Sequence, residues 1–223
     1  MARMRCSVVL LLLLLTTTCR AEDDDEDDLS TNKSENADFK YVTCGSVIKL
    51  KHQNSGARLH SHEIPYGSGS QQQSVTGQPD SGDLNSFWTV KGPYGKTCKV
   101  GSHVKIGTPF RLEHLNTKKN LHSHDYQSPI TKQFEVSAFG DKGDGDINDN
   151  WVVEPVEKAS DVHWLRGQQI RLKHSGTSRY LSTSSSHKYS NPINGQQEVS
   201  CVTKATSDTI WATAEGIHFP ALS

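Results

Sequence analysis

The stretch Arg58-Leu59-His60-Ser61-His62 occurs again as Asn120-Leu121-His122-Ser123-His124 and, altered, as Tyr180-Leu181-Ser182-Thr183. A Leu-x-His triplet precedes each copy, and a single tryptophan follows it about 30 residues later. These landmarks are Leu50-Lys51-His52, Leu112-Glu113-His114 and Leu172-Lys173-His174 before the copies, and Trp88, Trp151 and Trp211 after them. A unit of about 60 residues that occurs three times and then stops predicts a closed threefold object rather than an open array.

Each unit contains short segments in which apolar and polar residues alternate, as they do in half-buried strands. Such segments lie at residues 47–50, 110–112 and 169–172, and turn-forming residues follow at 54–56, 116–118 and 175–177. No segment after Tyr41 keeps a helical period. We therefore predict an all-β fold, a β-trefoil, in which the hairpins of three repeats close and cap one small barrel.

The recurring tryptophans and the recurring leucines (Leu59, Leu121 and Leu181) take equivalent places in this fold. Core packing is the favoured interpretation, because a tryptophan that every repeat needs is typical of a structural position. An aromatic binding surface is the alternative.

The N-terminus has the form of a secretory signal peptide, residues 1–21. Arg3 and Arg5 precede an apolar run at residues 8–15, which is too short to span a bilayer, and a cleavage site follows Ala21. Consecutive acidic residues at 22–28 then begin an arm, residues 22–41, that we expect to be disordered. Its role is solubility or, alternatively, docking to a basic partner or loose calcium binding. Asn32 opens an Asn-Lys-Ser sequon and is the predicted glycosylation site.

The folded part is expected at residues 42–217, with repeats at about 42–94, 101–156 and 165–216 and a tail at 218–223. From Val42 onward the chain has 19 Lys+Arg and 16 Asp+Glu, a balance that gives no reason to expect a nucleic-acid partner. We find no second apolar run long enough for a membrane span.

Three cysteines remain after the signal peptide. Cys44 and Cys98 precede the first strand of neighbouring repeats, at entry points that lie close in a trefoil. A secretory compartment is oxidising, so we predict a Cys44–Cys98 disulfide. Cys201 is expected to be a buried free thiol.

The paired histidines are the main candidates for a binding site. On a strand, residues two apart share a face, so each His-x-His pair presents two imidazoles together. The third repeat has Ser182 in place of the first histidine, and no cysteine or carboxylate stands at a fixed offset to complete a metal site. We therefore expect no metal, and we predict that the histidines line a polar groove, where they hydrogen bond to a ligand or to turn carbonyls. An exposed role in ligand binding is the interpretation we favour. The groove residues are Arg58, His60, His62, Asn120, His122 and His124.

No catalytic motif is present. Asp144-x-Asp146-x-Asn148 begins like a calcium loop, but Asp149 stands where the glycine belongs and Pro155 where the bidentate glutamate would be. We interpret this segment as a turn before the last strand of the repeat. A nucleophile elbow and a phosphate-binding glycine loop are also missing from the sequence. The sequence thus predicts a protein that is not an enzyme and needs no cofactor.

Several motifs resemble the stromal cell-derived factor 2 family, including its "-like" members. Besides the first two copies quoted above, they are Pro65-Tyr66-Gly67-Ser68-Gly69-Ser70, Gln72-Gln73-Ser74-Val75-Thr76-Gly77, Ser128-Pro129-Ile130, Glu135-Val136-Ser137-Ala138-Phe139-Gly140, Gly195-Gln196-Gln197-Glu198-Val199 and Ile210-Trp211 with Glu215-Gly216. The resemblance runs from about Val42 to Gly216, and its repeat is the MIR module, also found in protein O-mannosyltransferases and in inositol-trisphosphate and ryanodine receptors.

This resemblance implies a trefoil of three MIR repeats in the lumen of the endoplasmic reticulum. It also implies a non-enzymatic partner of a lumenal J-domain co-chaperone and of BiP, which acts on unfolded client proteins in quality control and the unfolded-protein response. The chain ends Phe219-Pro220-Ala221-Leu222-Ser223, without a retrieval tetrapeptide of the Lys-Asp-Glu-Leu type. We therefore expect retention through a partner, with part of the protein secreted.

Two other functions remain as alternatives. One is a lectin-like module that binds mannose-type glycans through the donors around Arg58 and Asn120, an expectation that rests on analogy with other trefoils. The other is a secreted signalling factor, suggested by the missing retrieval tetrapeptide.

Overall fold

The computed structural model describes residues 39–193 and 195–222, so the expected signal peptide, most of the acidic arm and Asn32 lie outside the described residues. Each repeat contributes four strands and one short 3-10 helix. The first repeat has β1 (Val47–His52), β2 (Arg58–Pro65), β3 (Gln73–Gln78), η1 (Leu84–Ser86) and β4 (Trp88–Lys91). The second has β5 (Pro109–His114), β6 (Asn120–Gln127), β7 (Phe134–Phe139), η2 (Ile147–Asp149) and β8 (Trp151–Pro155). The third has β9 (Ile170–His174), β10 (Tyr180–Lys188), β11 (Gln197–Val202), η3 (Ser207–Thr209) and β12 (Trp211–Ile217).

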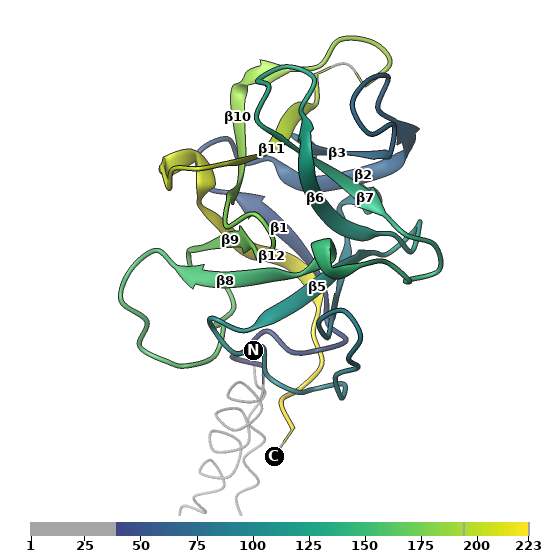
Figure 1. Cartoon of the computed structure of the whole chain (residues 1–223). Helices are drawn as coiled ribbons and strands as arrows, with labels where there is room; N and C mark the ends of the chain where they lie inside the picture. The colour runs from purple at the N-terminus through teal and green to yellow at the C-terminus, as the bar shows by residue number, and fades with distance from the viewer. Residues whose placement is uncertain (1–38, 194, 223) are drawn as a thin grey trace, which may run out of the picture.

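The strands form a closed barrel and a cap. Antiparallel pairing runs from β1 to β4, β5, β8, β9 and β12 and returns to β1, which closes the barrel. The hairpins β2–β3, β6–β7 and β10–β11 form the cap, in which β3, β7 and β11 also pair with one another. Figure 1 shows the cap at the top, with the barrel beneath it. This is the predicted β-trefoil, which leaves no long strand edge open.

The recurring tryptophans and leucines are core residues, as predicted: all six are fully buried. Each indole Nε1 donates a hydrogen bond to the backbone carbonyl of the leucine in its own repeat. The distances are 2.9 Å from Trp88 to Leu59, 2.8 Å from Trp151 to Leu121 and 3.0 Å from Trp211 to Leu181. The tryptophan therefore ties the last strand of a repeat to its second strand.

In the second and third repeats, the histidine of the Leu-x-His triplet links the repeat to the previous one. Nδ1 of His114 hydrogen bonds with Thr117 Oγ1 in the following turn, and Nε2 lies 2.9 Å from the carbonyl oxygen of Asn85 in η1. His174 makes the equivalent contact, 2.7 Å, with the carbonyl of Asn148 in η2. Burial lowers the pKa of both histidines. These imidazoles are structural.

The barrel end opposite the cap is closed by one buried residue from each repeat: Val42, Val104 and Trp164. Their backbones form a triangle of hydrogen bonds of 2.9–3.0 Å. Tyr41, expected to end a disordered arm, belongs instead to this closure, because its backbone pairs with Leu165 and its hydroxyl donates to Asp161.

The tail after β12 runs back along the same end of the barrel. Thr43 Oγ1 donates to the carbonyl of Phe219, and the backbone N–H of Leu222 donates to the carbonyl of Gly101. Within residues 39–193 and 195–222, no helix has the length and apolar character that crossing a membrane requires.

Candidate functional site

His60 lies against the 3-10 helix of its own repeat. Its side chain extends from β2 and is 1% exposed, with Nδ1 3.2 Å from Thr76 Oγ1 and Nε2 3.4 Å from Asp83 Oδ2. Asp83 is the N-cap of η1, because its carboxylate accepts the backbone N–H of Asn85. Burial lowers the pKa of His60 to about 4, although the Asp83 carboxylate opposes this shift. The imidazole is therefore neutral near pH 7.

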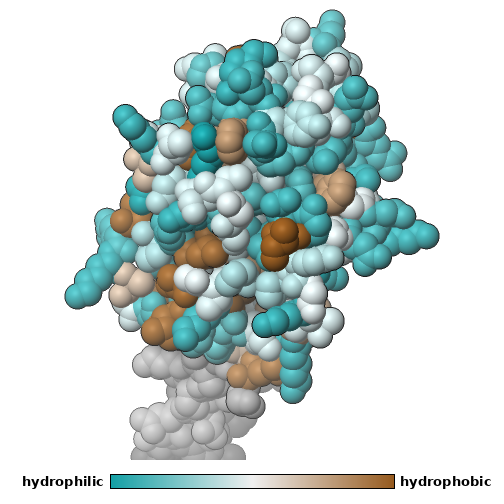
Figure 2. Space-filling model, in the orientation of Figure 1, coloured by the Kyte–Doolittle hydropathy of each residue, from teal (hydrophilic) through white to brown (hydrophobic). Residues whose placement is uncertain are grey.

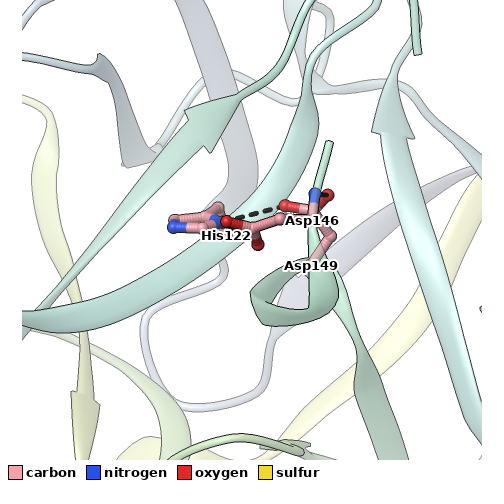
Figure 3. Close-up of side chains that lie close together, drawn as sticks. All are labelled: His122, Asp146 and Asp149. Atoms are coloured by element: carbon pink, nitrogen blue, oxygen red, sulfur yellow. Dashed lines mark hydrogen bonds and ion pairs between the residues drawn. The ribbon is translucent and has the colours of Figure 1, made fainter. Parts of the chain in front are cut away.

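His122 takes the same place in the second repeat, where two carboxylates meet it (Figure 3). The ring extends from β6. Asp146 is the N-cap of η2, and Asp149 is its last residue. Nδ1 lies 2.9 Å from Asp149 Oδ1 and 3.6 Å from Asp146 Oδ1. Both His122 and Asp149 are buried. Asp146 is the more exposed partner, with 41% of its side chain accessible.

These carboxylates correct one conclusion from the sequence, that nothing stands at a fixed offset to the histidine pairs. Ligand atoms of His122, Asp146 and Asp149 lie within 4.8 Å of one another, close enough to consider a metal ion. However, Asp149 Oδ2 accepts the backbone N–H of Asp146 at 2.8 Å, and Asp146 Oδ1 accepts that of Asn148 at 2.7 Å. Both carboxylates thus already cap η2. The group accounts for the capped turn before β8 that the sequence predicted.

The expected exposure of the six-residue groove is wrong for His60, Asn120 and His122, which are buried. Asn120 donates from Nδ2 to the carbonyl of Gly143 at 3.2 Å. Arg58 is paired with Glu215 of β12 and has 12% of its side chain accessible. The alternation along β2 and β6 correctly predicted that the two histidines of a pair share one face of the strand. That face packs against η1 or η2 and is not open to solvent.

His62 and His124, the second member of each pair, are half-buried. The ring of His62 lies 5.0 Å from that of His60, and the ring of His124 lies 5.2 Å from that of His122. His124 Nε2 is 3.1 Å from the Glu135 carboxylate. Ligand binding by these two side chains stays a prediction.

Two buried glutamates hold the loops of the cap, and we did not single them out from the sequence. Glu135 of β7 accepts hydrogen bonds from the backbone and the hydroxyl of Ser70, in the hairpin loop of the first repeat. Glu198 of β11 accepts from the backbone N–H groups of Ile130 and Thr131 at 2.6 and 2.9 Å. Each carboxylate thus fixes the hairpin loop of the preceding repeat. The recurring Glu-Val dipeptide was the signal in the sequence, and it is absent from the first repeat, which has Ser74-Val75.

A disulfide joins Cys44 and Cys98 in the structure, with their Cα atoms 6.2 Å apart. It connects the segment before β1 to the segment between β4 and β5. Cys201 of β11 is a buried free thiol, and burial raises its pKa to about 12. Such a thiol is not a nucleophile near neutral pH.

The third repeat has an open groove of about 500 Å³. We call it the third-repeat groove. Its walls come from β10, β11, the turn around η3 and the β6–β7 hairpin. Lining side chains include Ser182, Ser184, Ser200, Lys204, Thr206 and Asp208. The structure therefore places an open groove in the one repeat that lacks the paired histidines.

Comparison with known proteins places the chain among MIR-domain proteins. The MIR domain family model matches residues 60–150. The stromal cell-derived factor 2-like protein of Dictyostelium discoideum is 52% identical over 181 residues, which cover 80% of this chain and 84% of that protein. Stromal cell-derived factor 2 of Homo sapiens is 44% identical over 176 residues, which cover 79% and 81% of the two proteins.

Solved structures agree in fold. The crystal structure of the SDF2-like protein from Arabidopsis thaliana matches with a TM-score of 0.78 and 45% identity, over 82% of this chain and 99% of that one. One chain of the S. cerevisiae protein O-mannosyltransferase Pmt1-Pmt2 complex, solved with its sugar donor, matches with a TM-score of 0.70 and 33% identity. That match covers 81% of this chain and 26% of that chain. The chain belongs to the stromal cell-derived factor 2 family.

Proposed function

We propose that this protein is a non-enzymatic subunit of a complex in the lumen of the endoplasmic reticulum that contains a J-domain co-chaperone and BiP. In that complex it assists the folding and quality control of client proteins. Family membership over the whole trefoil carries the proposal, since the aligned relatives share four fifths or more of their own length with this chain. The signal peptide expected at residues 1–21 and the Cys44–Cys98 disulfide also fit an oxidising lumen.

The placement of the titratable groups supports a binding role rather than catalysis. Two histidine–aspartate pairs, His60 with Asp83 and His122 with Asp149, hold the 3-10 helices η1 and η2 against the neighbouring strands. The thiol of Cys201 is buried. Catalytic acids and bases need access to a substrate, and these side chains have little.

The cap loops are the proposed contact with the co-chaperone. Glu135 and Glu198 fix two of these loops in place, so the surface is rigid before a partner binds. Tyr126 and Ile130, in and after β6, are 53% and 37% exposed there. On the face seen in Figure 2 the cap is mainly hydrophilic, and most hydrophobic residues show over the barrel. Exposed aromatic and aliphatic side chains in a polar surround are typical anchors of a protein interface.

Affinity isolation after mild crosslinking in the lumen tests the proposal. The unaltered protein should recover a J-domain protein together with BiP. A variant with Tyr126→Ala and Ile130→Ser should lose both, whereas Ile147→Ser, at a side chain 61% exposed on η2, should keep them. Recovery of neither protein by the unaltered chain would refute the proposed complex. Equal recovery by all three forms would refute the cap as the contact.

Retention by association gives a second test. If the protein stays in the lumen only through its partner, depletion of the J-domain protein should raise the amount found in the medium. An unchanged amount in the medium would contradict retention by complex formation.

A further inference from the structure

The third-repeat groove lies where the other two repeats carry their paired histidines. Backbone pairing sets this equivalence, because Ser182 faces Ser200 across the hairpin as His60 faces Thr76 and His122 faces Ser137. Ser182 and Ser184 therefore occupy the positions of the two imidazoles. The turn around η3 forms the opposite wall, in the place that η1 and η2 take in the other repeats.

The side chains at these positions explain why the groove is open. In the first two repeats, the first imidazole is nearly fully buried and packs edge-on against the second. A serine side chain has a single heavy atom beyond Cβ and leaves that space unfilled. Ser182 Oγ donates to the backbone carbonyl of Asp208 at 3.0 Å, so the contact with the 3-10 helix persists without a ring. The groove thus arises from two substitutions on a shared scaffold.

The lining selects one chemical class of ligand. Hydroxyl-bearing residues are the most frequent in the walls, and the ionisable residues are one lysine, Lys204, one histidine, His187, and two carboxylates, Asp208 and Glu198. These opposite charges disfavour a phosphate or another strongly anionic group. Val202 is the one aliphatic residue in the lining, which contains no Phe, Tyr, Trp, Leu, Ile or Met, so it offers little to an apolar peptide segment. Neutral donors and acceptors of this kind match a polyhydroxylated ligand, and the volume of about 500 Å³ falls in the range of small-ligand sites.

We propose that the third-repeat groove binds a neutral glycan through the hydroxyl groups of one or two sugar rings. The glycan site therefore lies in the repeat without paired histidines, away from Arg58 and Asn120. Affinity is modest because no aromatic face stacks on the sugar. This proposal goes beyond the chaperone complex and does not depend on it, since it concerns a ligand of the isolated protein.

The test is a titration of the mature, isotopically labelled protein, followed by amide chemical shifts in NMR spectra. The probes are α-1,2-mannobiose, maltose and N,N′-diacetylchitobiose, with inorganic phosphate and a Ser-Gly peptide as comparisons. At least one disaccharide should move the amides of Ser184, Thr206 and Asp208 in a saturable way and leave those of His60 and His122 in place.

The repeats themselves provide the matched variant. Ser182→His with Ser184→His installs the histidine pattern of the other two repeats, and it should fill the groove and abolish the shifts. Thermal melting checks its folding, and Lys204→Ala, on the opposite wall, is a second variant that should weaken binding at least several-fold. His187→Ala, at an exposed lining residue, measures the contribution of the rim.

Three results would overturn the proposal: no saturable shift at the groove with any disaccharide, equal sugar binding by the folded histidine variant, or saturation by phosphate or peptide alone. Loss of sugar binding in the histidine variant with unchanged recovery of the J-domain protein would support a glycan site that is separate from the partner contact.

Discussion

Acidification should destabilise this protein partly through His60. The imidazole is 1% exposed, and burial lowers its pKa to about 4 from an ordinary value of 6.5. The folded state thus disfavours the proton, while the unfolded chain accepts it near pH 6.5. The free energy of unfolding is therefore unaffected by His60 above pH 6.5. It decreases as the pH falls from 6.5 towards 4, because the unfolded chain then binds a proton that the folded protein does not.

The size of the effect follows from the two pKa values. The full difference corresponds to about 3 kcal/mol at roughly 1.4 kcal/mol per pH unit, and about 2 kcal/mol of this should be lost between pH 7.5 and pH 5.0. Urea denaturation at both pH values measures the free energy of unfolding. His60→Ser, which copies Ser182 of the third repeat, should make the loss on acidification about 2 kcal/mol smaller than in the unaltered protein.

The double difference isolates His60, because burial also lowers the pKa of His52, His114 and His174, and these histidines act in both proteins. His187→Ser is the matched control, since this side chain is exposed in the folded protein. An equal loss on acidification in the unaltered and His60→Ser proteins would show that burial does not hold His60 neutral.

Three further changes test other parts of the fold. Trp151→Ala should lower the free energy of unfolding by about 3–5 kcal/mol in urea denaturation, and an unchanged stability would refute its core role. Cys44→Ser with Cys98→Ser should cost about 4 kcal/mol, for a sequence separation of 54 residues, and peptide mapping without reduction should find the linked pair; free thiols at both positions would end that prediction. Glu198→Gln should speed amide hydrogen exchange at Ile130, and unchanged exchange would contradict the role of the carboxylate.

The fold was predictable from the sequence because the same core residues recur in each of the three repeats. Trp88, Trp151 and Trp211 recur at one place in each unit, and a core position that every repeat needs leaves that periodic signal. The strand segments around Leu50, Leu112 and Leu172 were recognisable for the same reason, since their alternation reports burial on one face.

The site was not predictable in the same way. The spacing of His60 and His62 told us that both rings share a face, but not what covers that face. Coverage depends on η1, more than 20 residues later, and a histidine with partners at both nitrogens can be buried like an apolar residue. Whether a groove is open depends on how much of the space between two elements their side chains fill. The sequence does not show this, and the packing of Ser182 and Ser184 against η3 does.

The pairing of β1 with β12 has a consequence for biosynthesis. Val47 lies opposite Ile217, so the first barrel strand to be made closes against the last. The N-terminus of a nascent chain is made first, so β1 and β9 each lack a neighbour until Trp211 and the residues after it have been synthesised. The polypeptide must pass through a period with two uncovered strand edges, a form that is prone to aggregate. During that period it needs the same protection that a client protein needs.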